Sequence, residues 1–472
     1  MMFLIIILGC AFFTLAWRRL DLALAVVLFA LPSYQIRFNV GIPTNLLEIL
    51  VWLLFLTWLW RNRFSKVKNI KALWGKSGDV KRKIAYPFQW EIFGWLIIGF
   101  IAAGVSGFTT SALGIFKAYF FEPILFYLVA VNVLVSMPDI ISRWRLVVWP
   151  LATSASLVGV VSIYQFITGD LILNPFWSAE ATRRATGLFA YPNAVGLYVE
   201  LIIFLTLGFI FLLCNNHSSK KIRIEKIGLG LSIGFAVTAV ILAKSVGAAL
   251  GIGAGLVLFI WLINRKWRAI IVTTVLVTVL VVALVPVVRQ PLIRQLTLTS
   301  FSGQVRRVQW QETWKMLQGD SHWLLGAGLA GYQTAIASYH TPGIFVYDYS
   351  DPDSHRKMVW NEAYRKAHWQ PLEIYLYPHN IILNFWTEIG LVGLLLFIWL
   401  IGRLIFLSAR LFRRNTLSEN NFVYAGIISA MVALIIHGLV DVPYFKNDLS
   451  LVFWLVVALV SVPIIELKLA NK

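Results

Sequence analysis

Long apolar runs recur along most of the chain, separated by connections that hold most of the charged residues. A helix needs about 20 apolar residues to cross a bilayer, and somewhat shorter runs also serve. The pattern gives thirteen candidate spans, of which the first two are short. They are residues 3–16, 20–33, 44–60, 88–107, 119–136, 145–168, 194–214, 227–243, 246–263, 269–287, 380–401, 422–440 and 449–465. The sequence therefore predicts an all-α integral membrane protein with about 12–13 transmembrane helices.

One segment interrupts this rhythm. Residues 288–378 contain no comparable apolar run, and they are too many for a simple connector. We expect three parts: an amino-terminal transmembrane bundle of about ten spans over 1–287, a loop or lid with short helices over 288–378, and about three carboxyl-terminal spans over 379–472. Within the loop, Trp310, Trp314 and Leu317 follow the spacing of one helix face, which predicts a helix packed on an apolar surface.

Composition supports the membrane class. Of the 472 residues, 59% are hydrophobic and 13% are charged, with a mean hydropathy of +0.76. Such a composition excludes a water-soluble globular protein of this size. The only two cysteines, Cys10 and Cys214, give neither a disulfide framework nor a zinc signature.

The distribution of lysine and arginine predicts the orientation. One alternating set of connections, together with the carboxyl terminus, holds 26 of these residues, whereas the short connections of the other set hold six. Cytoplasmic loops carry the excess of positive charge, so the first set is cytoplasmic and the 288–378 loop lies outside. The formal charge of +19 is then mostly this excess, facing anionic lipid. The expected partner of these charges is the lipid bilayer, and no nucleic acid is expected.

The six lysine and arginine residues in the short outer connections are not explained by the orientation of the chain, since the positive-inside rule places such residues in the cytoplasm. Arg183 and Arg184 precede a span that opens with Tyr191, Pro192 and Asn193. Proline suits the first turn of a helix, and helix amino termini favour anions. The sequence therefore predicts an anion site on the outer face, with Arg183, Tyr191 and Asn193 as substrate-binding candidates beside Arg184.

A similar motif follows the long loop. Tyr377, Pro378, His379 and Asn380 open the next expected span, which again predicts polar side chains at a helix amino terminus. The helix dipole disfavours the protonated imidazole there, so His379 is a candidate general base. An interfacial residue that caps its own helix is the alternative for His379. Asn380 is a further candidate for substrate binding.

Arg306 and Arg307 add two adjacent cations from the long loop. From their position alone, both arginines are expected to be solvated charges of the loop, and position does not distinguish Arg306 from Arg307. Both are carried forward as candidate anion ligands.

Three further patterns have simpler interpretations. Gly326, Gly328 and Gly331 spell a dinucleotide-binding fingerprint, but no strand–helix–strand unit surrounds them, and a turn is expected. Asp351-Pro-Asp353 resembles an acidic metal-binding pair, but an Asx turn is expected in this loop. His437 and Asp441 lie four residues apart at the outer end of a span, where an inter-helix hydrogen bond is expected. No metal site and no cofactor is predicted.

The motifs, in their order, resemble the bacterial O-antigen ligase and polymerase superfamily. They are RATGLFAYPNAVGLY, RRVQWQETWKMLQGDSHWLLGAGLAGY, YPHNIILNFWTEIGLVGLLLF and HGLVDVPYF, with the long external loop between the second and third. The resemblance covers roughly residues 145–465, and the amino-terminal third matches mainly in hydropathy.

The resemblance implies a GT-C type glycosyltransferase architecture in the bacterial cytoplasmic (inner) membrane, with the active site facing the periplasm. It implies an undecaprenyl-pyrophosphate-linked glycan as donor and metal-independent, inverting transfer to an acceptor hydroxyl. The catalytic residues that it implies are Arg184, three residues before Gly187, His379, and Arg306, with Arg307 as the rival.

The acceptor stays open. A ligase takes lipid A–core, a polymerase takes another glycan repeat unit, and a protein O-oligosaccharyltransferase takes a protein. A bicarbonate or other anion transporter and a flippase for lipid-linked glycan are alternatives of another class. Transporters place ionisable residues deep in several spans, whereas here the notable cations gather at the outer rim and Glu200 and Glu388 lie two to three turns inside their helices.

Overall fold

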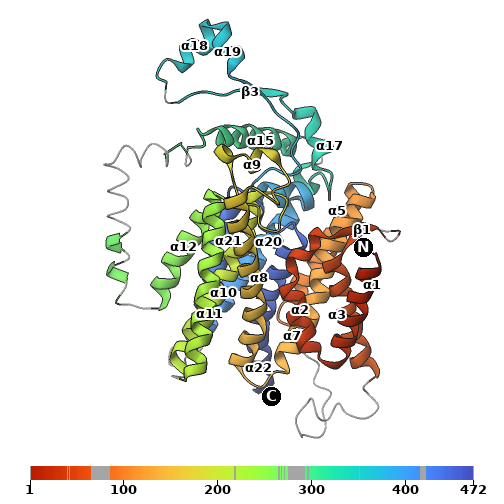
Figure 1. Ribbon diagram of the computed structural model, residues 1–472. Coiled ribbons are helices and arrows are strands. Elements are labelled where there is room, and N and C mark those ends of the chain that lie inside the picture. The colour runs from red at the N-terminus through yellow and green to blue at the C-terminus, as the bar shows by residue number, and fades with distance from the viewer. Residues whose placement is uncertain are drawn as a thin grey trace.

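The fold is a bundle of long helices with a smaller helical layer over one end (Figure 1). The computed structural model describes residues 2–39, 41, 43–64, 86–216, 219–263, 266, 268–270, 272–274, 293–294, 297–319, 322–349, 351–414 and 421–470. Across these residues the regular secondary structure is helical apart from two short two-stranded sheets. The expected all-α integral membrane class is therefore confirmed.

The amino-terminal part forms the first group of helices. It comprises α1 (Met2–Arg18), α2 (Leu20–Phe29), η1 (Leu31–Gln35), α3 (Leu46–Phe64), α5 (Gln89–Val105), α6 (Thr110–Ile115), the π-helical turn η3 (Phe116–Phe121) and α7 (Glu122–Val135). An antiparallel hairpin of β1 (Arg37–Asn39) and β2 (Pro43–Asn45) joins η1 to α3, with Phe38 opposite Thr44.

The remaining helices of the bundle follow in two further stretches of sequence. The central group comprises α8 (Ile140–Thr168), α9 (Pro175–Ser178), η4 (Glu180–Thr182), α10 (Pro192–Asn216), α11 (Lys220–Leu242) and α12 (Val246–Ile263). The carboxyl-terminal group comprises α20 (Ile381–Arg414), α21 (Asn421–Gly438) and α22 (Asn447–Ala470).

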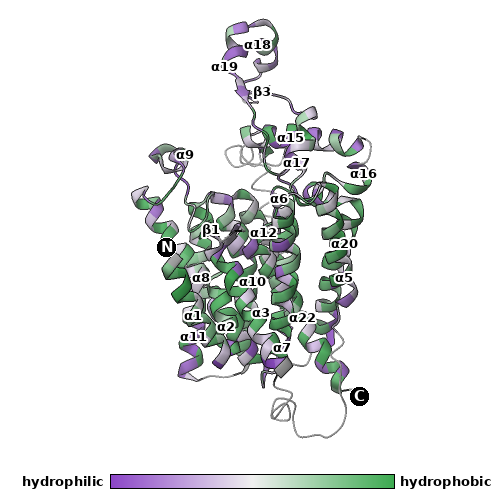
Figure 2. Ribbon diagram, turned by 90° about the vertical axis from the view of Figure 1, so that its right-hand side faces the viewer, coloured by the Kyte–Doolittle hydropathy of each residue, from purple (hydrophilic) through white to green (hydrophobic). Residues whose placement is uncertain are grey.

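Eight helices in the described residues are long and apolar enough to cross a membrane, and α1, α2 and α5 are shorter apolar helices. Hydrophobic residues dominate the bundle, whereas hydrophilic residues concentrate at its ends and above it (Figure 2). The expected span over 269–287 lies largely outside the described residues. The figure of 12–13 spans stays a prediction.

Local sequence explains where the helices begin and end. The Asp139 side chain accepts the backbone N–H of Ser142 at 2.8 Å and caps α8, as an amino-terminal aspartate should. Gly169, with φ of 81°, ends the same helix in the left-handed conformation. Pro192 is the first residue of α10, as its motif predicts.

The second such motif behaves differently from the prediction. α20 begins at Ile381, so Pro378 and His379 precede the helix and do not form its first turn. The reason is the conformation of His379, whose φ of 45° is incompatible with a right-handed helix. Asn380 instead caps the helix, because its Oδ1 accepts the N–H groups of Ile382 and Leu383.

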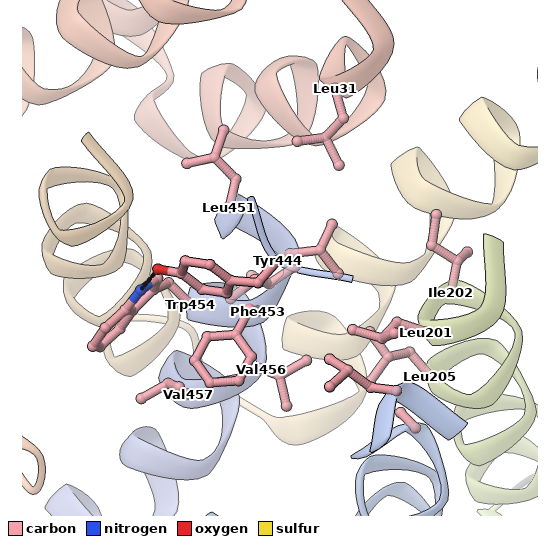
Figure 3. Close-up of a cluster of buried hydrophobic side chains, with 14 of the residues drawn as sticks. Leu31, Leu201, Ile202, Leu205, Tyr444, Leu451, Phe453, Trp454, Val456 and Val457 are labelled. Atoms are coloured by element: carbon pink, nitrogen blue, oxygen red, sulfur yellow. Dashed lines mark hydrogen bonds between the residues drawn. The ribbon is translucent and has the colours of Figure 1, made fainter. Parts of the chain in front are cut away.

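The core of the bundle lies around α22, which is buried continuously over residues 447–462. Figure 3 shows Trp454 and Phe453 of α22 beside Tyr444, with leucine and isoleucine side chains of α10 nearby. The Trp454 Nε1–H donates to the Tyr444 hydroxyl at 3.1 Å, which satisfies the indole N–H inside this apolar cluster. The segment before α22 is thereby fixed to the centre of the molecule.

The layer over the bundle, residues 297–378, is the lid. It contains α15 (Phe301–Gln318), α16 (His322–Leu325), α17 (Tyr332–Ile336), η5 (Ala337–Tyr339), β3 (Gly343–Phe345), α18 (Ser354–Trp360), α19 (Glu362–Ala367) and β4 (Trp369–Pro371). β3 pairs with β4 antiparallel, with Ile344 opposite Gln370. These strands and the two helices between them form an arm, residues 343–371, that projects away from the bundle (Figures 1 and 2).

The lid is joined to α20 at a break in that helix. Gly390 has φ of 72° and ψ of 178°, which no helical residue adopts. Around this break Ala327 N–H donates to the Thr387 carbonyl at 2.7 Å, and Ala330 N–H donates to Glu388 at 3.0 Å. The glycines of the apparent dinucleotide fingerprint make this approach possible, since a Cβ on Gly326 would lie 2.5 Å from the Thr387 carbonyl oxygen.

Candidate functional site

Four polar side chains from distant parts of the sequence belong to one connected group at the lid end of the bundle. Arg184 precedes α10, Arg306 lies on α15, His379 precedes α20, and Asp441 lies between α21 and α22. Direct hydrogen bonds, a close histidine–carboxylate contact and the mutual repulsion of the two arginines link them. The structure thus brings together the three residues expected to be catalytic and adds a carboxylate.

Arg184 is held by backbone and side-chain oxygens. Its Nε donates to the Ala243 carbonyl at 2.9 Å, and its Nη2 donates to the Asn193 Oδ1 at 2.9 Å. Burial, and then the charge of Arg306, lower the pKa of Arg184, although an arginine stays protonated at any physiological pH. Two like charges kept close together in a half-buried place favour the binding of an anion between them.

Asn193 connects Arg184 to the carboxylate. Its side-chain amide accepts from Arg184 and donates through Nδ2 to the Asp441 Oδ2 at 3.1 Å. Asp441 is 1% exposed, and its Oδ1 accepts the backbone N–H of Val442. The sequence analysis placed Asn193 correctly near Arg184 but did not select Asp441 as a site residue.

Asp441 faces His379. The His379 Nδ1 lies 3.8 Å from the Asp441 Oδ1, and it has no hydrogen-bond partner among the described residues. Burial by itself raises the pKa of Asp441, but the interactions with His379 and His437 outweigh it and keep that pKa below its usual range. The carboxylate is therefore ionised and directed at the imidazole.

His379 is positioned by α15 and by its own strained backbone. Gln309 Nε2–H donates to the Tyr377 carbonyl at 2.7 Å, and Trp310 Nε1–H donates to the Pro378 carbonyl at 2.8 Å. The left-handed conformation of His379 costs on the order of 1–3 kcal/mol and persists only where the surroundings impose it. The helix that carries Arg306 therefore also fixes the peptide that presents His379.

The two adjacent lid arginines differ in environment. Arg306 is partly buried, and its charge acts on Arg184, Tyr375 and Tyr377, whereas Arg307 is exposed. The two residues point in different directions because consecutive positions of a helix are about 100° apart. The geometry therefore favours Arg306 over Arg307.

The other candidates have distinct positions. Arg183 donates through Nε and Nη1 to the carbonyls of Ser178 and Phe166, at 3.1 Å each, so it fixes the end of α8. The Tyr191 hydroxyl lies 3.1 Å from the Tyr377 hydroxyl, beside the His379 ring. Asn380, besides capping α20, donates through Nδ2 to the Leu439 carbonyl at 3.0 Å, in the loop that holds Asp441.

The remaining patterns agree with their simpler interpretations. Asp351 Oδ1 accepts the Asp353 N–H at 3.0 Å, which is an Asx turn, far out on the arm. His437 Nδ1 lies 2.8 Å from the Glu200 Oε2, so the expected inter-helix hydrogen bond joins α21 to α10. In the part of the chain that the structure describes, no three histidine, cysteine, aspartate or glutamate side chains are grouped as metal ligands.

Asp441 was hard to find from sequence. Its contacts, Asn193 and His379, lie 248 and 62 residues away. The available signal was an acidic residue at the expected outer end of a span. Because Asp441 lies four residues after His437, the sequence analysis interpreted the pair as an inter-helix hydrogen bond and not as part of the site. Asp441 and His379 can meet because both flank helix ends at the same end of the bundle, where polar residues are expected.

The fold and the site define a class: a polytopic, all-helical membrane protein with a lid at one end, where two arginines, a histidine and an aspartate come together. Residues 231–398 match the family model described as O-Antigen ligase. This match to part of the chain supports the superfamily that its motifs resemble and an enzyme of the ligase or polymerase glycosyltransferase type. The match includes Arg306 and His379 and ends before Asp441. No curated protein matches the sequence.

Proposed function

We propose that this protein transfers a glycan from undecaprenyl pyrophosphate to an acceptor hydroxyl at the outer face of the cytoplasmic membrane, without a metal and with inversion at the sugar. The observation that carries the proposal is the linked set of Arg184, Arg306, His379 and Asp441, where the lid meets the bundle. The short connections at the lid end hold few lysine and arginine residues, so the arginines there are not needed to orient the chain. We infer that they bind a ligand.

The two arginines suit the leaving group. When the bond between sugar C1 and the phosphate oxygen breaks, its electron pair stays on the diphosphate, whose negative charge grows. Guanidinium groups stay protonated and donate paired hydrogen bonds to phosphate oxygens. Arg184 and Arg306 therefore bind the donor diphosphate and stabilise the charge that develops on it.

His379 suits the acceptor. A hydrogen bond from its Nδ1–H to Asp441 needs only a small approach across the present 3.8 Å, and catalytic hydrogen bonds commonly tighten when substrate binds. With the proton held on Nδ1, Nε2 is free to take the proton of the acceptor hydroxyl as its oxygen attacks C1 from the face opposite the diphosphate. Asp441 then stabilises the imidazolium, and the sugar configuration inverts.

The acceptor class is not selected by the described contacts. Lipid A–core, a second lipid-linked repeat unit and a protein hydroxyl all require the same donor chemistry. The proposal names an O-antigen ligase-like reaction first, with repeat-unit polymerisation and protein O-glycosylation as the other acceptor choices.

The test uses purified protein in nanodiscs with a synthetic undecaprenyl-pyrophosphate oligosaccharide, EDTA and each acceptor class in turn. We expect transfer by the wild type in EDTA, and a loss of about 10²–10⁴-fold in His379→Ala, the range typical of a general base. Arg184→Ala and Arg306→Ala should lose both donor affinity and rate.

Arg307→Ala is the matched control, since Arg307 neighbours Arg306 but is exposed. It should transfer at the wild-type rate. Normal turnover by His379→Ala would overturn the assignment of the base. Anion uptake by proteoliposomes without any glycan transfer would instead support a transporter.

A further inference from the structure

Lys446 is a cation at the lid end that the mechanism above does not use. It lies in the loop between α21 and α22, directly before the first residue of α22. It is also one of the outer cations that the positive-inside rule does not explain. Other outer cations have protein partners: Lys117 pairs with Glu48 at 2.7 Å, and Arg183 donates to backbone carbonyls.

The ammonium group of Lys446 lacks such a partner. Its Nζ is shielded from solvent and makes no hydrogen bond to any described residue. It lies 4.0 Å from the centroid of the Tyr191 ring, a cation–π contact that satisfies none of its three N–H donors. A buried ammonium without hydrogen bonds is costly, so the position calls for an anionic ligand.

Lys446 adjoins the proposed active site. The Tyr191 ring beneath its ammonium carries the hydroxyl that contacts Tyr377, and the Tyr377 ring centroid lies 4.6 Å from that of His379. The charge of Asp441, the carboxylate that faces His379, also acts on Lys446. Two tyrosines, Tyr191 and Tyr377, thus lie in sequence between the ammonium and the imidazole.

We propose that Lys446 is an anion ligand of this site, and that its ammonium binds a phosphate oxygen of a lipid-linked substrate. This inference rests on the proposed function and adds a third cation to Arg184 and Arg306. The chemistry is that of a phosphate or diphosphate ester, which the donor diphosphate or a phosphate on a lipid acceptor supplies.

The electrostatic surroundings agree with an anionic ligand. Burial lowers the pKa of Lys446 to about 8, although Asp448 and Asp441 act in the opposite direction. A bound phosphate adds negative charge and stabilises the protonated form further. The competing explanation is a direct pair with Asp448, whose Oδ1 is also without a hydrogen bond in the described residues.

The test measures binding before it measures transfer. Lys446→Met keeps the length and apolar stem of the side chain over Tyr191 and removes the charge. In nanodiscs, we expect it to weaken the Kd for undecaprenyl pyrophosphate by about 10–100-fold, the value of one charged hydrogen bond. Lys357→Met on the arm is the control, since Lys357 pairs with Asp351 far from this site.

Separate KM values identify the source of the phosphate. If the donor diphosphate is the ligand, Lys446→Met raises the Kd for undecaprenyl pyrophosphate and the KM of the donor. If the acceptor supplies it, the donor values hold and the KM of a phosphorylated acceptor rises, while its dephosphorylated form shows no difference between variant and wild type. Lys446→Gln gives the same comparison if the methionine variant does not fold.

The inference is overturned if both variants keep wild-type Kd and KM values, or if the only effect is lower thermal stability, as a structural pair with Asp448 requires. It fails separately from the proposed function. If undecaprenyl pyrophosphate binds in a way that depends on the charge of Lys446 but no acceptor is glycosylated, Lys446 remains a ligand and the transferase proposal is contradicted. If glycan transfer occurs and the Kd and KM values of Lys446→Met equal those of the wild type, the transferase proposal stands and the role of Lys446 is contradicted.

Discussion

The carboxylate of Asp441 is buried and ionised, and it faces the imidazole of His379 with its Oδ1 3.8 Å from the Nδ1. An amide at this position keeps the shape but loses the charge that stabilises an imidazolium. We expect Asp441→Asn to lower kcat by about 10²-fold or more while donor binding changes little. Single-turnover transfer and a donor binding isotherm give the two values.

Asp353→Asn is the control for this prediction, since Asp353 lies on the exposed arm. A fall in donor affinity equal to the fall in kcat would contradict the prediction, because it would show that Asp441 supports the fold of the site and not the proton transfer.

Lys446 makes a prediction about stability that is independent of any substrate. Its folded-state pKa of about 8 lies below the ordinary value of about 10.4 for a lysine. The charged form therefore costs stability below pH 8, and the cost disappears as the pH rises from about 8 to about 10.4. Without ligand, Lys446→Met should be more stable than the wild type at pH 7, by about 1–3 kcal/mol.

The measurement is thermal unfolding of both proteins in detergent between pH 7 and pH 10.5. The difference should shrink with rising pH, with Asp441, Asp448 and Tyr191 as the neighbouring groups that both proteins share. A variant that is less stable at pH 7 would show that Asp448 already pairs with the ammonium.

The sequence predicted the chemistry of single residues better than their partners. Arg184 and His379 stand out because a cation and a histidine at the outer ends of spans have no role in orientation. The choice of Arg306 over Arg307 depends on which face of α15 meets the bundle. The sequence does not show this face, because the two arginines are adjacent and have the same neighbours in the sequence. Asp441 needs contacts across hundreds of residues, which hydropathy does not encode.

At the level of elements, α20 combines a membrane span with the attachment point of the lid. The break at Gly390 leaves carbonyls of α20 free for the lid loop, and a Cβ there would lie 2.3 Å from the Leu324 carbonyl oxygen. We expect Gly390→Ala to destabilise the protein by at least about 1–3 kcal/mol, since alanine is strained at this φ and displaces the loop. Thermal unfolding and protease cleavage of the lid report both effects.

Gly402→Ala is the matched control in the same helix. Nothing lies within 4 Å of a Cβ at Gly402, so alanine should be neutral or stabilise the helix by up to about 1 kcal/mol. Equal unfolding temperatures for the two variants would show that the break does not hold the lid.

Apolar runs predicted the helices well and their ends poorly. The expected span 194–214 corresponds to α10, and 246–263 to α12, because a helix that crosses the bilayer needs an apolar run of matching length. The span expected over 380–401 continues to Arg414, since a helix does not stop where its residues become polar. The Gly390 break was missed, because an isolated glycine in an apolar run is ordinary in membrane helices.

For the whole molecule, the lid end and the outer face should coincide. A cysteine at Trp360, an exposed residue on the arm, should react with a membrane-impermeant maleimide added to intact cells from which the outer membrane has been removed. A cysteine at Lys220, where α11 begins at the opposite end of the bundle, should react only after lysis.

Both substitutions are made after replacement of Cys10 and Cys214, which are exposed in the isolated chain. The reverse labelling pattern would place the candidate site in the cytoplasm and contradict the proposed donor, whose glycan is used at the outer surface.

The lid also determines when the site is completed during synthesis. Its loop is fixed between an early helix and a late one: Leu329 N–H donates to the Ala102 carbonyl and Ala327 N–H to the Thr387 carbonyl. Chains emerge from the ribosome amino terminus first, so a nascent chain that ends after α15 holds both arginines without His379. Only when α20 and the loop before α22 have entered the membrane does His379 meet Asp441. In the proposed mechanism, a prematurely terminated chain therefore has the anion ligands but lacks the base, and it transfers no glycan.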